Sequence, residues 1–245
     1  ADARNRDREE SRGPLHGVPI AAKDVIDTAA MPIIFDPRVS SGLVGHLVGA
    51  ITGSAITRGT SFLKDALGTQ VFDSSITIID DPHRVRGLRS KPFDGEGLPT
   101  QRRAIIEKGR LTTWLLDSAS ARQLGLAPTG HASRGVSGPP GAGATNLHME
   151  AGDVSPAELM ADIKEGFYVT DLIGHGVNGL TGDYSRGASG FVIRNGQIEG
   201  AVAEVTIAGN LKDMFRTLIP ANDLDFRHGT NAPTLRLEGM TLAGD

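Results

Sequence analysis

The sequence predicts an α+β domain made mainly of antiparallel β-sheet, arranged as a barrel or a sandwich, with four or five helices. From Gln70 onward, short apolar segments of strand character alternate with turn-forming residues. The regular strand–helix alternation of a parallel, doubly wound sheet is missing. Glycine makes up 32 of 245 residues without a collagen-like period, which indicates turns, bulges and close backbone approaches.

The first regular element is predicted to be a glycine-striped helix over residues 39–57. Apolar residues recur there every four positions beside a parallel row of minimal side chains: Ser41, Gly45, Gly49 and Gly53. Each internal glycine costs roughly 1 kcal/mol relative to alanine, so we expect this row to pack closely against another backbone. Serine and threonine dilute the hydrophobicity of the segment and no aromatic belt flanks it. We therefore predict a buried helix of a soluble protein and no membrane span.

Caps, turn residues and period-two patterns predict the other elements up to residue 145. They are a helix over 61–67 stopped by Gly68, a strand over 75–79, a loop over 91–100, a hairpin over 102–116 turning at Lys108-Gly109, and a helix over 118–124 ending at Gly125. Residues 127–145 are predicted to be irregular, and so long a loop in a compact domain tends to be functional or mobile.

The clearest local signals lie in the last hundred residues. Ser155 and Glu158 form a capping-box pattern for a helix that extends to about residue 164. Asn195-Gly196 is the strongest short signal for a type I′ hairpin turn. The remaining predictions are a strand over 167–173, a hairpin over 187–207, a helix over 211–218 capped by Asn210, and a closing strand over 235–242.

Composition and motifs exclude several functions. The formal net charge of −4 gives no general attraction to nucleic acid, and the cluster of Arg84, Arg86, Arg89 and Lys91 is interpreted as a solvated loop. The absence of cysteine excludes thiolate catalysis and cysteine-ligated metals. None of the seven histidines belongs to an HExxH motif, and no GxSxG or phosphate-binding glycine pattern is present. The residues alone therefore predict no catalytic group and no metal ligand.

Several phrases along residues 32–245 resemble the C-terminal domain of the PmbA/TldE proteins in the TldD/PmbA metallopeptidase family. They include PIIFDPRVSSGLVGHLVGAITGSAITRGTSFLKDALG (32–68), GDYSRGASGF (182–191) and VTIAGNLKDM (205–214). The resemblance implies a cytoplasmic subunit of a TldD/TldE proteolytic complex. Proteins of this family were once labelled modulators of DNA gyrase. It also implies that the HExxxH zinc site belongs to TldD-type subunits, whereas TldE-type subunits lack it.

A different resemblance covers residues 13–32. GPLHGVPIAAKDVIDTAAMP is similar to the first block of the amidase signature family, in which Lys23 would be the general base of a Ser–Ser–Lys triad. The Gly/Ser-rich block that carries both amidase serines is absent. We therefore divide the chain into residues 1–31, an amidase-like fragment or fusion segment, and residues 32–245, a TldD/PmbA-type C-terminal domain.

The resulting hypothesis is a non-catalytic TldE/PmbA-like subunit that needs no cofactor of its own. Its expected partners are a zinc-bearing TldD-type subunit, unfolded peptides or a second copy of itself, with no nucleic acid and no membrane. Antiparallel edge strands could hold an extended peptide by backbone hydrogen bonds. The residues expected to line the peptide channel are Asp94, Glu96, Asp183, Tyr184 and Arg186.

Two alternatives remain open at this point. One is an autonomous hydrolase, either an amidase that uses Lys23 or a metal-dependent peptidase that uses histidines. The other is an interaction module that acts on a topoisomerase through protein–protein contacts.

Overall fold

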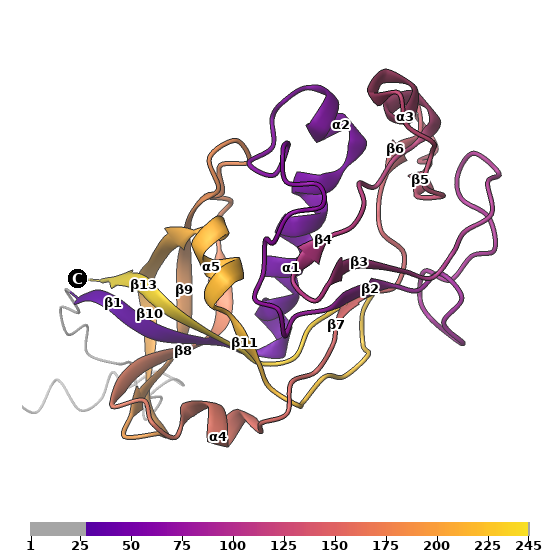
Figure 1. Ribbon diagram of the computed structural model, residues 1–245. Helices are drawn as coiled ribbons and strands as arrows, with labels where there is room; N and C mark the ends of the chain where they lie inside the picture. The colour runs from indigo at the N-terminus through magenta and orange to yellow at the C-terminus, as the bar shows by residue number, and fades with distance from the viewer. Residues whose placement is uncertain (1–27, 245) are drawn as a thin grey trace, which may run out of the picture.

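A closed β-barrel forms one half of the molecule in the computed structural model, which describes residues 28–244 (Figure 1). The sheet order is β1-β8-β9-β10-β13-β11, and β1 also pairs with β13, so five strands form a ring. All neighbours in this sheet are antiparallel except β1 and β8. The strands are β1 (Thr28–Phe35), β8 (Glu165–Ile173), β9 (Asp183–Arg194), β10 (Gln197–Asn210), β13 (Leu235–Ala243) and, outside the ring, β11 (Ile219–Pro220).

A second sheet of five short strands forms the other half, in the order β12-β7-β2-β3-β4. Its strands are β12 (Thr230–Asn231), β7 (Leu147–Met149), β2 (Ile78–Asp80), β3 (Arg103–Glu107) and β4 (Arg110–Leu111). A two-stranded ribbon, β5 (Ala132–Ser133) with β6 (Gly141–Ala142), lies beyond it. The predicted α+β class and the barrel arrangement are therefore confirmed.

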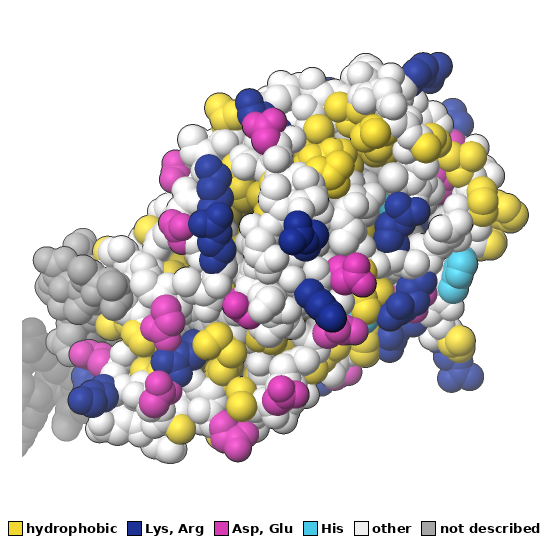
Figure 2. Space-filling model, viewed as in Figure 1, with side chains coloured by type: hydrophobic (Ala, Val, Ile, Leu, Met, Phe, Trp, Pro, Cys, Tyr) yellow, Lys and Arg dark blue, Asp and Glu magenta, His cyan; other side chains and the backbone are white. Residues whose placement is uncertain are grey.

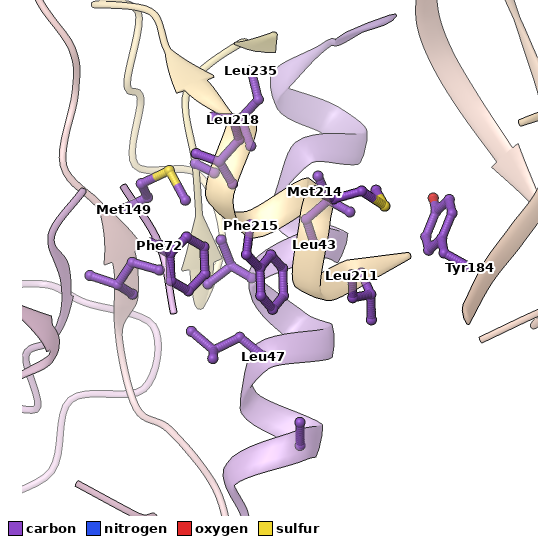
Figure 3. Close-up of a cluster of buried hydrophobic side chains, with 14 of the residues drawn as sticks. Leu43, Leu47, Phe72, Met149, Tyr184, Leu211, Met214, Phe215, Leu218 and Leu235 are labelled. Atoms are coloured by element: carbon purple, nitrogen blue, oxygen red, sulfur yellow. The ribbon is translucent and has the colours of Figure 1, made fainter. Parts of the chain in front are cut away.

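Helix α1 (Pro37–Ile51) lies between the barrel and the second sheet (Figure 1). It starts there because Asp36 caps it, accepting a hydrogen bond from the Arg38 N–H at 3.0 Å. Its buried side chains, Leu43 and Leu47 among them, join a hydrophobic core that both sheets share. Within this core the rings of Phe72 and Phe215 stack with centroids 4.4 Å apart (Figure 3).

Four shorter helices complete the described part of the chain: α2 (Gly53–Thr57), α3 (Ser118–Leu124), α4 (Pro156–Met160) and α5 (Leu211–Thr217). The capping box predicted at Ser155 and Glu158 is present at α4, and Gly125 ends α3 with a φ of 66°. Among residues 28–244 no helix is both long and apolar enough to cross a bilayer.

The single helix predicted over 39–57 is wrong, because the chain breaks at Thr52, where ψ is 143°. Gly53 lies against the side chains of Ser120 and Leu116, so a side chain there would collide with them. The expectation of close packing holds at Gly53 but is wrong at Gly45 and Gly49. An added Cβ would meet no atom within 4 Å at either position.

Other boundaries differ where tertiary contacts override local signals. The helix predicted over 61–67 is absent, and turns replace it because the Ser61 hydroxyl donates to the Ala50 carbonyl at 2.6 Å. The strand predicted over 75–79 begins only at Ile78, α4 stops at Met160, and the second arm of the 102–116 hairpin shrinks to β4. The predicted turns at Lys108-Gly109 and Asn195-Gly196 are confirmed, since all four residues have positive φ.

Strand β1 crosses the position at which the sequence was divided. It begins at Thr28, and Met31 pairs with Met240 of β13, so residues 28–31 belong to the barrel. Lys23 and the rest of the amidase-like segment lie outside the described residues.

Two glycines provide a matched test of this packing. Gly190 of β9 faces the Tyr168 carbonyl of β8 so closely that a Cβ would collide with it, whereas Gly45 faces open space. We expect Gly190→Ala to lower the free energy of unfolding by about 1–3 kcal/mol through overpacking. Gly45→Ala should raise it by about 0.5–1 kcal/mol, since alanine favours helix. Urea denaturation of the full chain measures both, and equal stabilities of the two variants would contradict the described barrel packing.

Candidate functional site

A groove of about 320 Å³ lies between the exposed side of α1 and residues 174–182, the loop from β8 to β9. Its walls come from five segments of the chain, which fall into an early group before residue 63 and a late group after residue 174. The lining residues are Gly45, His46, Gly49, Ala50, Thr60, Phe62, His175, Val177, Gly179, Arg186 and Leu211. Gly45 and Gly49 are exposed and carry no side chain, so the backbone of α1 forms one wall.

Backbone hydrogen bonds fix the loop that forms the opposite wall. The Ser185 N–H donates to the Gly176 carbonyl at 2.7 Å, and the Asn178 N–H donates to the Asp183 carbonyl at 2.8 Å. The Phe62 N–H donates to the Gly179 carbonyl at 2.8 Å and so ties this loop to the chain that follows α2. The groove is therefore held open by a network of backbone bonds.

The polar side chains of the groove are hydrogen-bond donors or neutral groups, and the lining contains no carboxylate. Arg186 is half-buried, and its Nε donates to the Ile173 carbonyl at 3.2 Å. Burial, and then the positive charge of Arg186, lowers the pKa of His46 below its ordinary value of 6.5. The His46 imidazole is thus mainly neutral at pH 7, and the planar guanidinium of Arg186 is a cation that a bound anion would face.

Tyr184 lies behind His46, with the two rings edge-on and their centroids 5.9 Å apart. The Tyr184 side chain is 2% exposed, and its hydroxyl has no hydrogen-bond partner among the described residues. Burial raises the pKa of this phenol to about 12. Tyr184 therefore supplies a neutral aromatic support for the imidazole of His46.

Of the five predicted channel residues, three lie at or beside this groove. Arg186 lines it and Tyr184 supports His46. Asp183 accepts hydrogen bonds from the Thr181 hydroxyl at 2.5 Å and from Asn210 Nδ2 at 3.0 Å, and these bonds lower its pKa. Asp183 thereby ties the loop to Asn210, the residue that caps α5.

Asp94 and Glu96, the other two, make their contacts elsewhere. Asp94 accepts hydrogen bonds from the backbone N–H groups of Glu96, Leu98 and Ala132 at 2.9–3.1 Å. Glu96 accepts from the N–H and hydroxyl of Ser118 at 2.8 and 2.6 Å, at the start of α3. Both carboxylates therefore fasten a turn to neighbouring elements, and neither is among the residues that line the groove.

Sequence reasoning missed His46 and His175 as site residues, because it treated the histidines as scattered. One signal was available: His46 stands within the row of glycines that the structure leaves open. His175 follows a strand end inside a glycine-rich loop, and no local pattern connects it to a helix more than a hundred residues earlier.

A second polar cluster, largely buried, joins residues of loop 127–145 to β2. Asp80 Oδ1 accepts from the Thr145 N–H and hydroxyl at 2.8 and 2.9 Å, and Asp80 Oδ2 lies 3.4 Å from His131 Nε2. His131 Nδ1 lies 2.8 Å from the Thr129 hydroxyl, which also accepts from the Leu116 N–H. With Asp80 1% and His131 2% exposed, this chain of groups anchors the loop to β2 and leaves no access for a substrate.

Residues 82–91, here called the basic loop, carry the arginines noted in the sequence. The Lys91 N–H donates to the Pro82 carbonyl at 2.9 Å and closes the loop, while Asn146 holds it from inside. Val85 and Leu88 are 87% and 74% exposed on it. Figure 2 shows Lys and Arg side chains beside hydrophobic ones on the right of the molecule, where Figure 1 places this loop.

The described residues offer no ready-made metal centre, since no three His, Asp or Glu side chains gather among them as ligands would. Polar groups gather in the groove, in the buried Asp80–His131 pair, and around a second hollow of about 380 Å³ that is lined by Asp36, Asp223, Asp225, Arg227 and His228 among others.

Comparison with known proteins identifies the class of this barrel-and-sheet unit. The sequence matches the PmbA/TldA metallopeptidase C-terminal domain over residues 28–244, and the chain belongs to that family. The predicted resemblance to the C-terminal domain of the PmbA/TldE proteins is confirmed.

Particular relatives agree with this assignment. The chain is 44% identical over 220 residues to Metalloprotease PmbA of Escherichia coli O157:H7, covering 89% of this chain and 47% of that protein. It is 40% identical over 222 residues to the Metalloprotease PmbA homolog of Haemophilus influenzae, covering 90% and 47%. The chain thus spans about half the length of these relatives.

Solved structures share the fold. A structure from Bacteroides thetaiotaomicron, described as a proposed modulator of DNA gyrase, is similar with a TM-score of 0.82 at 32% identity. The similarity covers 91% of this chain and 49% of that one. TldE from Thermococcus kodakarensis has a TM-score of 0.80 at 26% identity, covering 89% and 51%.

The neutral state of His46 predicts a pH dependence of stability. Because its pKa is lower in the folded chain than in the unfolded chain, protons favour unfolding. This contribution to stability is present above about pH 6.5 and is lost as the pH falls through the folded pKa. We expect His46→Gln to lose less stability than the wild type between pH 7 and pH 5, measured by urea denaturation. Parallel curves for the two proteins would contradict a buried, neutral His46.

Proposed function

We propose that this chain is part of a non-catalytic TldE/PmbA-like subunit that binds unfolded peptides in the cytoplasm. A TldD-type partner would supply the zinc and the residues that break the peptide bond. Family membership and the names of the relatives, which include TldE, support this assignment. The structural observation that carries it is the preformed groove along α1, lined by donors and apolar groups and by no carboxylate.

The arrangement of the histidines favours binding over catalysis by the described residues. A general base is usually oriented by a third group, often a carboxylate. Among the described histidines, His131 contacts a carboxylate, and its side chain is buried within loop 127–145. His46 and His175 line the groove without an Asp or Glu beside them in its wall. These two imidazoles are therefore suited to contacting a ligand, not to activating water.

The groove also suits a peptide better than the sheet edges do. The second sheet ends in strands of two residues, β4 and β12, and within the ring β10 pairs with β13 only over Thr206–Ala208. The rest of that β10 edge is irregular, with register shifts against β9 between Ile198 and Ala201 and between Val202 and Val205. These edges are too short or too irregular to be the preferred place for the strand addition expected from sequence. In the groove, exposed glycine backbone allows close approach, while Phe62, Val177 and Leu211 offer apolar contacts.

The basic loop is the surface we propose for contact with the partner subunit. Its ten residues hold four cations and no acidic side chain, in a chain whose net charge is −4. Val85 and Leu88 stand in solvent between these cations, and Arg86 is held at a φ of 57°, which non-glycine residues rarely adopt. A strained, well-anchored loop with exposed apolar side chains is typical of a binding surface.

The test of the proposed function is reconstitution. The full chain is mixed with a purified TldD-type subunit, complex mass is measured by light scattering, and cleavage of casein is followed with and without chelator. We expect a defined complex and cleavage that requires the TldD-type subunit and its metal. Lys23→Ala should change nothing. Chelator-resistant cleavage by the chain alone, lost in Lys23→Ala, would instead establish the autonomous hydrolase.

The partner surface has its own test. Val85→Asp or Leu88→Asp should weaken the complex at least tenfold, because a buried Val or Leu contributes roughly 1.5–3 kcal/mol. Val136→Asp is the control, since Val136 is even more exposed than Val85 and Leu88 but lies outside the basic loop. Affinities come from titration of one subunit into the other by calorimetry. Equal weakening by all three variants would show that the basic loop is not part of the interface.

A further inference from the structure

Arg186 differs from several other arginines of the described chain in its lack of an acidic partner. Arg38, Arg227 and Arg236 each form a salt bridge with Asp or Glu, with nitrogen–oxygen distances of 2.5–2.8 Å. No described carboxylate lies in ion-pair contact with Arg186, and its hydrogen bond to Ile173 occupies Nε alone. The guanidinium carries further N–H donors whose fork matches the two oxygens of a carboxylate.

The other side chains that line the groove near Arg186 also favour a negatively charged ligand. His46, His175 and Thr60 add groups that can donate hydrogen bonds, and the lining holds no acidic side chain to repel an anion. A half-buried cation without a counter-ion is costly unless a ligand supplies one. The complementary ligand therefore carries a negative charge at the Arg186 end of the groove.

The rest of the groove favours a ligand that is apolar beyond its charged end. Phe62, Val177 and Leu211 are apolar, and Gly45 and Gly49 leave room beside the α1 backbone. A volume of about 320 Å³ is at the small end of ligand pockets, so it accommodates a chain terminus better than a folded surface. An inorganic anion would leave the apolar walls unused.

We infer that the groove binds the free C-terminal carboxylate of an oligopeptide, with Arg186 as its anchoring residue. This inference rests on the proposed function and makes it specific: the chain would capture peptides by their carboxyl end. The last side chains of the peptide would lie along the glycine face of α1. Peptides that end in an amide would lose the charge-assisted bonds to the guanidinium.

The experiment compares three N-terminally fluorescein-labelled decapeptides of one sequence by fluorescence polarisation with the full chain. One ends in a free acid, one in an amide, and the third is the amide with a glutamate in its middle. We expect the acid to bind at least tenfold more tightly than both amides. Tight binding of the glutamate-bearing amide would show that any carboxylate suffices and would overturn the assignment to a chain end.

Variants locate the effect at Arg186. Arg186→Gln should abolish the preference for the acid and leave binding of the amide unchanged, while Arg186→Lys should keep part of the preference. Arg194→Gln is the matched control, since Arg194 lies on the same strand but outside the groove and pairs with Glu199. Equal acid binding by wild type and Arg186→Gln, with both folded by circular dichroism, would exclude Arg186 as the anchor.

A second pair of variants tests the groove without touching a charge. Gly49→Ala fills the wall beside the ligand, whereas Gly42→Ala adds the same methyl group on α1 outside the groove. We expect only Gly49→Ala to weaken binding of acid and amide alike, by threefold or more. If acid and amide bind equally well and Gly49→Ala weakens both, the carboxylate inference fails while the peptide-binding function stands. If no peptide binds, both fail.

Discussion

The packing of helix α1 between two sheets is the constraint on which the rest of this structure depends. Leu43, Leu47 and Ile51 are almost fully buried on the side that joins the barrel core to the second sheet. Burying each such side chain contributes roughly 1.5–3 kcal/mol, so the helix fixes the two halves relative to each other. Its remaining side then has a fixed position opposite the β8–β9 loop, and the groove between them is a product of that packing.

The exposed side of α1 carries a cost that packing within the described residues does not offset. Gly42, Gly45 and Gly49 each disfavour helix by roughly 1 kcal/mol relative to alanine, and each faces open space. Gly53 is different, because its lack of a side chain lets α3 approach. Gly45 and Gly49 line the groove, and helix stability given up at these two positions is typical of a surface retained for binding.

Sequence patterns predicted those features that depend on neighbouring residues. The capping box at Ser155, the Asn195-Gly196 turn and the αL glycine at Gly125 all follow from local hydrogen bonds and backbone sterics. The break at Thr52 depends on contacts with Leu116 and Ser120, and closure of the barrel depends on β1 meeting β13 at the far end of the chain. The groove depends on the break at Thr52 and on the closure of the barrel. The row of glycines could therefore be recognised in the sequence, whereas its exposure and its proximity to His175 could not be predicted.

Acidic and basic side chains have different roles in this fold, which supports the proposal that binding and hydrolysis belong to different subunits. Asp94, Glu96 and Asp183 each accept hydrogen bonds from neighbouring turns and caps, and Asp80 is buried with His131. These four carboxylates are thus committed to holding loops in place. Barrel pairing of Arg186 with Ile207 meanwhile fixes the position of its cation beside α1. With these acids holding loops in place and a cation left to the groove, the distribution of charge supports the proposal that the groove receives an anionic peptide end.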